Sequence, residues 1–427
     1  MKKLLLVALS ALTLSFSGRC QLYLLKADTL HVGNGTIISP AYFYFSADSI
    51  VAVGSHPVAG LAPDSVIEYR GGHVYPSFIA MSTLLGLVEI GAVRATRDYD
   101  EVGSITPNVR PIVAFNMDSR VVATTASNGV LVAQIRPAGG MLPGKTSVTY
   151  LKGRTWEEAA IRPEYGLYLS WPRRYYRTGW WSASPGRVRE NKQWKQQIDR
   201  LYTFFRAAQA YVQGPVPPHR RNPAYEGLRG VFLRGEPVFI EADHATDILA
   251  ALRFSETFGL RMVLVGGRGI GPVIDELRWR RIPVVLQTPH TLPAHPDAAV
   301  DEWFRMPVRL AEAGIPFAIA INKVWDGAWQ QRNLPFAAAT AVAYGLAPEQ
   351  ALAAITSVPA QLLGLDRRLG TLETGKEATF IVSRGPALDI PTHRISAAFI
   401  RGRRVSLGDP HQQLYRKYSR LYSIPAP

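Results

Sequence analysis

The sequence predicts an α/β fold, in which parallel strands and helices form a barrel beside a smaller β-unit made from both ends of the chain. Between residue 76 and about residue 365, short apolar runs alternate with amphipathic segments, a pattern typical of βαβ units. Residues 21–75 and 366–410 are instead rich in β-forming runs separated by turn residues. The two β-rich ends are therefore expected to complete one unit that flanks the barrel.

The expected elements follow from these patterns in chain order. The clearest βαβ unit spans residues 236–267, where a strand is followed by a helix over residues 248–258, with Gly259 as its stop, and by a second strand. Residues 411–427 are expected to form a helical tail. The other candidate strands are residues 22–25, 41–45 and 49–54, then 130–134, 283–286 and 316–321 in the barrel, and 371–382 and 397–405 near the end.

Residues 154–235 carry no evident strand signal and are rich in Trp, Tyr and Arg, including Trp180, Trp181 and a helical stretch from Trp194 to Tyr211. This segment is expected to be an insertion over one face of the barrel. Aromatic rings interleaved with arginines suit a site that stacks on a sugar or clamps an anionic ligand. The favoured interpretation is a helical subdomain or oligomer contact in which the aromatic rings are packed.

The first twenty residues form a predicted secretion signal. Met1–Lys3 is a charged start, and Leu4–Phe16 is an apolar run too short to span a membrane. Cleavage after Cys20 leaves Gln21 as the first mature residue. Lipidation of Cys20 is the alternative, and only this alternative predicts membrane attachment. Export to the periplasm or cell envelope of a bacterium is therefore expected, and with a single cysteine no disulfide can form within the chain.

Composition and charge limit the partners. With 427 residues, of which 47% are hydrophobic and 19% charged, the chain can bury a large core. Its formal net charge is +15, and removal of the predicted signal leaves 45 basic and 33 acidic residues. This excess suits anionic partners, but the favoured explanation is a solvated arginine-rich surface. An exported protein is not expected to bind nucleic acid.

Residues 71–85, which read GGHVYPSFIAMSTLL, provide the most informative motif. The motif resembles the first barrel strand of the amidohydrolase superfamily, which reads like GkxVxPGFIDxHxH. The chain is similar to the imidazolonepropionase-like branch of that superfamily over nearly its whole mature length. The other segments that carry the resemblance are residues 333–336, 343–352, 354–365 and 369–379, the last of which is similar to the family's closing motif GxLxxGKxAD.

This resemblance implies a (β/α)8 TIM-like barrel flanked by a β-sandwich made from both chain ends. It also implies an ancestry among hydrolases of non-peptide carbon–nitrogen bonds. In active members, histidines at the ends of the first, fifth and sixth strands and an aspartate after the eighth bind one or two metal ions. Such an ion lowers the pKa of bound water to about 7 and polarises the scissile carbonyl.

None of the family's metal ligands is present at the corresponding positions of this chain. The first-strand histidine positions fall on Ser82 and Leu84, and the family's first-strand aspartate falls on Ala80. The remaining ligand positions fall on Glu241, Gly266 and Asn322, and the lysine nearest to a carbamylated ligand is Lys145, in a glycine-rich loop. The resemblance therefore implies a pseudoenzyme, which has lost the standard metal-dependent catalysis and acts as a binding or partner subunit.

Several polar residues remain near the expected mouth of the barrel. The candidate catalytic residue is Glu241, as a general base acting on water. No cofactor is expected, and the alternative is a relocated site in which Glu241, Asp243 and His244 hold one divalent ion such as zinc. The candidate ligand-binding residues are Gln134, Arg136, Asp243, His244, His290 and Asn322, with His295 nearby.

Simpler roles compete with ligand binding at three of these positions. Asp243 and His244 are placed to cap the following helix and face solvent. His290 lies in a proline-rich loop and is placed either to hold a ligand or to hydrogen-bond that loop. The expected partners are a small polar or peptide-like ligand, a second copy of the chain, or an active amidohydrolase homologue that pairs through residues 154–235.

Overall fold

The computed structural model describes residues 21–179, 186–215, 219, 221–287, 290, 293, 297–321 and 327–424. The predicted signal segment with Cys20 lies outside the described residues, as do Trp180, Trp181, His295 and Asn322. The helices of the described part are η1 (Arg94–Thr96), η2 (Pro111–Ala114), α2 (Arg120–Ser127), α3 (Trp156–Ala159), α4 (Trp194–Gln213), α5 (Pro223–Glu226), α6 (Arg229–Arg234), α7 (Ala245–Phe258), η4 (Gly271–Val273), α8 (Ile274–Trp279), α9 (Glu302–Glu312), α10 (Gly327–Gln330), η5 (Gln331–Asn333), α11 (Leu334–Ala343), α12 (Pro348–Ala353), α13 (Ser357–Leu362) and α14 (Pro410–Leu421).

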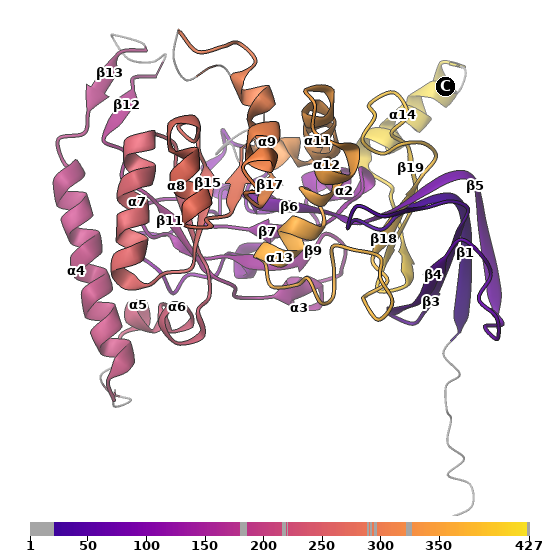
Figure 1. Cartoon of the computed structure of the whole chain (residues 1–427), viewed down its shortest axis with the longest axis horizontal. Helices are drawn as coiled ribbons and strands as arrows, with labels where there is room; N and C mark the ends of the chain where they lie inside the picture. The colour runs from indigo at the N-terminus through magenta and orange to yellow at the C-terminus, as the bar shows by residue number, and fades with distance from the viewer. Residues whose placement is uncertain are drawn as a thin grey trace, which may run out of the picture.

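Both ends of the chain meet in one composite sheet of eight strands, which lies on the right in Figure 1. Its order is β20-β19-β18-β5-β1-β3-β4, and β2 pairs with β1. The strand β5 lies parallel to β1 on one side and antiparallel to β18 on the other. The strands are β1 (Leu22–His31), β2 (Ile37–Ile38), β3 (Ala41–Ser46), β4 (Ser49–Gly54), β5 (Ser65–Pro76), β18 (Phe380–Ser383), β19 (Ile395–Ile400) and β20 (Arg403–Val405).

An aromatic core holds the composite sheet together. Phe43 and Phe45 come from the start of the chain, whereas Phe380 and Phe399 come from its end, and all four side chains are buried. The rings of Phe380 and Phe399 stack with centroids 4.5 Å apart, and Phe43 meets Phe380 edge-on at 4.9 Å. Because the strands form one hydrogen-bonded sheet around their own core, the expected two-sheet sandwich is not confirmed.

The strands expected to form the barrel lie in two further sheets, named the barrel sheets after that expectation, and Figure 1 shows helices α7, α8, α9 and α11–α13 lying over them. The first sheet has the order β10-β9-β7-β6, with β6 parallel to β7. The second has the order β17-β16-β15-β14-β11-β8, and all of its strands except β8 are parallel to one another. The strands are β6 (Phe78–Thr83), β7 (Val130–Ile135), β8 (Gly144–Lys145), β9 (Ser147–Tyr150), β10 (Ala160–Arg162), β11 (Leu167–Ser170), β14 (Val238–Ala242), β15 (Met262–Gly266), β16 (Val284–Leu286) and β17 (Phe317–Ile319).

The α/β character of the prediction is confirmed, but closure into one eight-stranded barrel is not. No hydrogen-bonded ladder among the described strands joins the two barrel sheets. The βαβ unit of residues 236–267 is confirmed as β14, α7 and β15. Gly259 ends α7 with a φ of +61°, a left-handed conformation that favours glycine.

The expectation that residues 154–235 contain no strand is wrong. The segment holds β10 and β11, and a small hairpin of β12 (Tyr175–Arg177) and β13 (Val188–Glu190). The strand β11 lies beside β14 inside the second barrel sheet, with Leu167, Tyr168 and Leu169 buried and Ser170 half-buried. Its sequence Leu167–Ser170 is only four residues long and fully apolar except for its end, so periodicity does not distinguish it from a loop or a helix fragment.

The aromatic residues of the long helix α4 are packed rather than free. Phe205 is fully buried, and its ring centroid lies 4.8 Å from that of Phe254 and 5.4 Å from that of Phe258 on α7. Tyr202 meets Phe254 edge-on at 5.1 Å. The interpretation of α4 as a packed helix is therefore confirmed, whereas the β12–β13 hairpin remains exposed.

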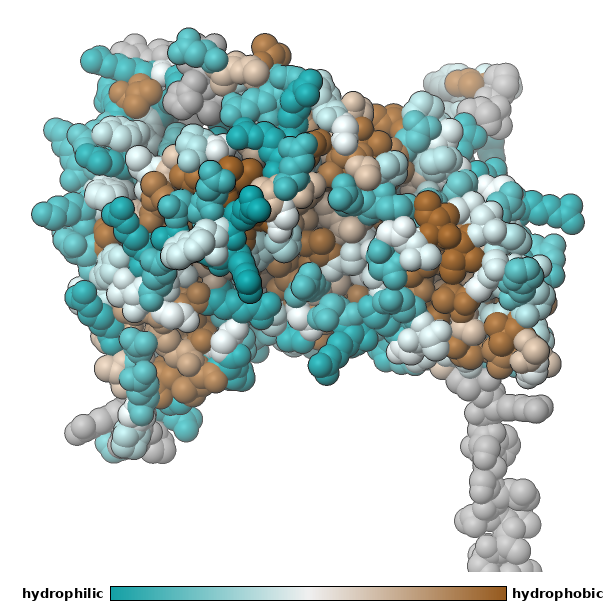
Figure 2. Space-filling model, viewed as in Figure 1, coloured by the Kyte–Doolittle hydropathy of each residue, from teal (hydrophilic) through white to brown (hydrophobic). Residues whose placement is uncertain are grey.

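The molecular surface is largely hydrophilic in the view of Figure 2, with apolar patches that include one over the composite sheet at the right. The helix α14 extends from the body at the C-terminal end of the chain (Figure 1). In the part of the chain that the structure describes, no helix has the length and apolar character needed to cross a bilayer.

A stack of two histidines and a tyrosine joins the composite sheet to the barrel. His31 lies at the end of β1, and its Nδ1 is 2.7 Å from a carboxylate oxygen of Glu349 on α12. Its Nε2 is 3.3 Å from Nδ1 of His73 on β5, and its ring stacks on Tyr75 with centroids 4.2 Å apart. Burial lowers the pKa of His73 below 6.5, and the neighbouring His31 lowers it further.

We expect this stack to make stability depend on pH. Because the pKa of His73 is lower in the folded chain than its ordinary value of 6.5, the unfolded chain binds the proton more tightly. The free energy of unfolding should therefore decrease as pH falls below 6.5 through the lowered pKa. In urea unfolding at about pH 7.5 and about pH 5, His73→Asn should lose less stability between the two pH values than the unchanged chain. The exposed His411→Asn is the control, and equal pH dependence in all three proteins would contradict the expectation.

Candidate functional site

The candidate site lies where the parallel barrel strands end. The register of the second sheet places Ser170 of β11 beside Glu241 of β14, and Glu241 beside Val265 of β15. The carboxyl ends of parallel strands meet at one face, which is where active sites of β/α barrels lie. Ser82 of β6 reaches the same face, because its hydroxyl contacts a side chain of β11.

Glu241 is the acceptor at the centre of this face. Its Oε2 accepts hydrogen bonds from the hydroxyls of Tyr168 and Ser170, both at 3.2 Å. Its side chain keeps 11% of its surface exposed, so the carboxylate is held by the protein but still reached by solvent. The strand register produces this geometry, since Tyr168 and Ser170 are two residues apart and point to the same side of β11.

A hydrogen-bond chain connects Ser82 with Glu241. The hydroxyl of Ser82 donates to Oη of Tyr168 at 3.5 Å, and Oη of Tyr168 donates to Oε2 of Glu241. Burial strongly raises the pKa of Tyr168; nearby Arg136 opposes the rise and Glu241 adds to it. The phenol therefore stays protonated at neutral pH and remains a donor to the carboxylate.

Arg136 and Gln134 hold the first members of this hydrogen-bond chain in place, because Arg136 contacts Tyr168 and Ser82 and Gln134 contacts Ser82. Arg136 is 2% exposed, its guanidinium lies 4.5 Å from the ring centroid of Tyr168, and its Nε donates to the carbonyl of Ser82 at 3.3 Å. Gln134 is fully buried; its Oε1 accepts from the Ser82 amide at 3.2 Å and its Nε2 donates to Thr146 at 3.1 Å. Ser82 has a φ of +53°, so these contacts hold a left-handed backbone conformation in place.

Asp243 and Arg173 form the outer part of the site. Nη2 of Arg173 lies 3.6 Å from Oδ2 of Asp243 and 3.9 Å from Oε1 of Glu241. Oδ1 of Asp243 accepts the amide of Gly267 at 3.1 Å. One guanidinium therefore stands between the two carboxylates. Gly266 allows this arrangement, because a Cβ at that position would approach Oδ1 of Asp243 to 2.7 Å.

The predicted histidines do not join Glu241. His244 is exposed and is the N-cap residue of α7, but its side chain makes no capping hydrogen bond. His290 is exposed, and its Nε2 lies 2.8 Å from the hydroxyl of Thr340 on α11. Leu84 is buried in a small apolar cluster with Val88, Ala138 and Ala328, and Ala80 lies in the main core.

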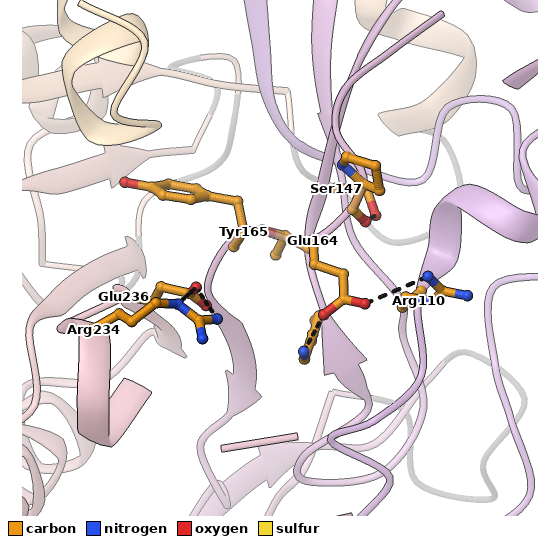
Figure 3. A network of polar contacts seen from close by, with 9 residues as sticks. Arg110, Ser147, Glu164, Tyr165, Arg234 and Glu236 are labelled. Carbon is orange, nitrogen blue, oxygen red and sulfur yellow. Dashed lines mark hydrogen bonds and ion pairs between the residues drawn. The ribbon is translucent and has the colours of Figure 1, made fainter. Parts of the chain in front are cut away.

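Lys145 belongs to a different polar network, of which Glu164 and Arg110 are labelled in Figure 3. Its Nζ contacts the carboxylate of Glu164, which also lies 3.5 Å from Nη1 of Arg110. Arg234 and Glu236 form a further ion pair in the same view, with a separation of 2.6 Å. Since Lys145 is paired with a residue that precedes β11, it does not extend into the group around Glu241.

The donors of this site do not match what a divalent ion requires. Across the described ranges, no three His, Cys, Asp or Glu side chains come together where they would hold a metal ion. Glu241 and Asp243 supply two carboxylates, and a catalytic zinc site ordinarily has three protein ligands. His244 does not complete the set, so the grouping proposed for a relocated ion is not formed.

A cavity of about 710 Å³ opens beside these residues. Ser170 and Arg173 belong both to the cavity wall and to the group around Glu241. The far wall comes from the β12–β13 hairpin and the first turns of α4. The remaining lining residues are Ser104, Gly140, Met141, Trp171, Pro172, Tyr176, Asn191, Gln193, Gln196, Gln197 and Arg200.

Sequence reasoning missed three residues of the site, Tyr168, Ser170 and Arg173. All three come from β11 or directly follow it, in a segment predicted to be an insertion without strands. The available signal was the short run Leu167–Ser170 bounded by Gly166 and Pro172, since such punctuation marks the ends of short buried strands.

We expect Arg136 to be structurally essential and Arg173 to be dispensable for folding. Arg136→Ala leaves the buried carbonyls of Ser82 and Pro137 without their donor and opens a cavity under Tyr168. The free energy of unfolding should fall by about 3 kcal/mol. Arg173→Ala, at a side chain that is 54% exposed, should change it by less than about 1 kcal/mol. Urea unfolding measures both, and equal losses would contradict the assignment.

Part of the chain matches a family model, and its structure is similar to solved structures of amidohydrolases. Residues 302–405 match the model of the amidohydrolase family. No curated protein sequence matches the chain significantly. An amidohydrolase from Thermotoga maritima has a similar structure, with a TM-score of 0.75, 22% identity, and coverage of 90% of this chain and 99% of that one.

Two further solved structures share the fold at lower similarity. A prolidase complexed with N-methylphosphonate-L-proline has a TM-score of 0.56 and 15% identity, and covers 90% of this chain and all of its own. A molinate hydrolase has a TM-score of 0.55 and 14% identity, with 91% and 95% covered. Residues 302–405 thus match the amidohydrolase family, and the chain as a whole shares the fold of these solved amidohydrolase structures.

Proposed function

We propose that this chain is a binding protein built on the amidohydrolase fold, which takes a small polar or peptide-like ligand and does not use the family's metal-dependent hydrolysis. One observation carries the proposal. The phenol of Tyr168 lies in hydrogen-bond contact with both Ser82 and Glu241. The resemblance in the sequence aligns these two residues with metal ligands of the active family members. A protonated phenol thus links side chains that a metal ion would otherwise join.

The charges of the outer site support the same proposal. Arg173 brings a cation to within 4 Å of both Glu241 and Asp243. A guanidinium donates hydrogen bonds but does not activate water as a metal ion does. Two acceptor carboxylates beside a partly exposed donor are complementary to a zwitterion, whose ammonium group meets the carboxylates and whose carboxylate meets Arg173. A free dipeptide or amino-acid amide has this charge pattern.

The adjoining cavity supports a peptide-like ligand in size and chemistry. Its volume of about 710 Å³ lies within the range of small-molecule sites. Four carboxamide side chains line it, Asn191, Gln193, Gln196 and Gln197. A carboxamide both donates and accepts hydrogen bonds, so it pairs with a peptide group. The aromatic Trp171 and Tyr176 add flat apolar surface.

The alternative function is hydrolysis with Glu241 as general base. It is favoured by the partial exposure of the Glu241 carboxylate, which leaves room for a water molecule within reach. In this alternative Tyr168 and Ser170 orient the carboxylate. The proposal has two further parts. The chain pairs as a partner subunit with an active homologue through the exposed β12–β13 hairpin, and it is exported to the periplasm.

We expect Arg173 to be needed for ligand binding. In calorimetric titrations with a library of dipeptides and amino-acid amides, Arg173→Ala should weaken binding at least about tenfold, the equivalent of 1.4 kcal/mol. Arg174→Ala is the matched control, since that neighbouring arginine pairs with Glu190 instead. Its affinity should stay within about threefold of the unchanged chain. A chain that binds no member of the library, or equal losses in both variants, would contradict the proposed site.

Glu241→Gln distinguishes binding from hydrolysis. If Glu241 is a general base, any amide hydrolysis by the unchanged chain should fall at least about 100-fold in this variant. The binding proposal instead expects no turnover in either protein, with or without added zinc. It also expects elemental mass spectrometry to find no stoichiometric zinc or manganese after dialysis. Turnover that depends on Glu241, or a retained ion, would overturn the binding proposal.

A further inference from the structure

The helix α14 leaves a row of large apolar and aromatic side chains uncovered. Single exposed apolar residues are common on protein surfaces, but a contiguous group marks an interaction site. None of the helix residues is buried. The exposed side chains, with their exposed fractions, are Leu414 (50%), Tyr415 (48%), Tyr418 (44%), Leu421 (65%), Tyr422 (67%) and, just after the helix, Ile424 (51%).

These side chains gather on one side of the helix. Leu414, Tyr418, Leu421 and Tyr422 are spaced by four, three and one residues, which places them on one stripe of an α-helix. Tyr418 and Tyr422 stack with ring centroids 6.3 Å apart, which confirms that they share a side. The helix is therefore amphipathic, with its apolar stripe open to solvent.

The rest of the helix is positively charged. Arg416, Lys417 and Arg420 are its charged residues, and residues 410–424 contain no Asp or Glu. Nζ of Lys417 lies 5.4 Å from the ring centroid of Tyr418, so this cation sits beside the apolar stripe. The local charge thus has a single sign.

The start of the helix is fixed to the body, whereas the stripe is not covered by it. Asp409 is 3% exposed and caps the helix, accepting the amides of His411 at 2.8 Å and Gln412 at 3.1 Å. The helix touches α2 and otherwise extends from the body at the upper right of Figure 1. The fold therefore holds α14 in place without using its apolar stripe.

We propose that α14 binds the surface of an anionic membrane, lying in the interface with its apolar stripe toward the acyl chains. A cationic helix with an apolar side is the pattern of interfacial membrane helices. Tyrosine suits the headgroup region, because its ring is apolar and its hydroxyl is polar. Lipid phosphates supply the negative charge that Arg416, Lys417 and Arg420 lack among their neighbours on the helix.

A second copy of the chain fits this surface less well. Two α14 helices packed stripe to stripe would bring six like charges together, with no acidic residue on either helix to offset them. The proposal also does not depend on lipid attachment at Cys20, since α14 lies at the opposite end of the chain. It is independent of the ligand proposed for the barrel site.

Vesicle sedimentation tests the proposal. The mature chain from Gln21, which carries neither the apolar run Leu4–Phe16 nor Cys20, is mixed with vesicles of phosphatidylcholine alone or with an equal part of phosphatidylglycerol. The chain should bind the anionic vesicles and be released by about 0.5 M salt, which screens the charges. Leu414→Ser with Leu421→Ser, and separately the change of Arg416, Lys417 and Arg420 to Gln, should each reduce the bound fraction at least about fivefold.

A matched variant controls for general loss of surface hydrophobicity. Leu233 on α6 and Ile390 are exposed by 57% and 62%, and their change to Ser should leave vesicle binding unchanged. Thermal unfolding should be the same for all variants, because none of the altered side chains is buried. Equal vesicle binding by the α14 variants, or equal binding to both vesicle types, would overturn the proposal. A third outcome would also overturn the proposal: no form of the protein binds vesicles, but the unchanged chain is a dimer that dissociates in the Leu414 and Leu421 variant. That outcome would assign the stripe to contact with a second copy of the chain.

Discussion

The parallel pairing of β11 with β14 is the constraint on which the candidate site depends. It places Ser170 opposite Glu241, and the alternation of side chains along β11 then turns Tyr168 to the same side. A slip of one residue would bring Leu169 into that position and remove both hydroxyl donors. The amide of Trp171 extends the pairing by donating to the carbonyl of Glu241 at 2.9 Å, and Arg173 follows at the distance needed to reach Asp243.

The charged groups of this site belong to the chain itself. Arg136 lies beneath the Tyr168 ring, and Arg173 stands over the two carboxylates. Guanidinium groups remain protonated throughout the physiological pH range. The positive charge that these two arginines bring to the site is therefore set by the sequence. Such a site is well suited to hold a ligand in one orientation, as the proposed binding function requires.

Sequence reasoning succeeded where the pattern is local or where distant motifs combine. The unit of residues 236–267 has clear periodicity and a glycine stop, and the resemblance around residues 71–85 predicted the superfamily. It failed at β11, because a four-residue buried strand has no period to detect. It did not predict the Tyr168 link or the Arg173 ion pairs, since contacts of long side chains depend on tertiary packing. For the same reason the contact of His290 with Thr340 on α11 was not predicted.

The composite sheet has a consequence for the order in which the chain is completed. The strand β5 is formed from residues near the start, but from His73 to Pro76 its neighbour on one side is β18, which lies some three hundred residues later. Until that late segment arrives, β5 presents an open row of backbone donors and acceptors, which is a template for wrong pairing between chains. Contacts between such distant segments also form slowly. A chain truncated before residue 380 would keep most of the residues of the two barrel sheets, but the edge of β5 would stay unpaired. Premature termination should therefore yield aggregates rather than a smaller folded protein.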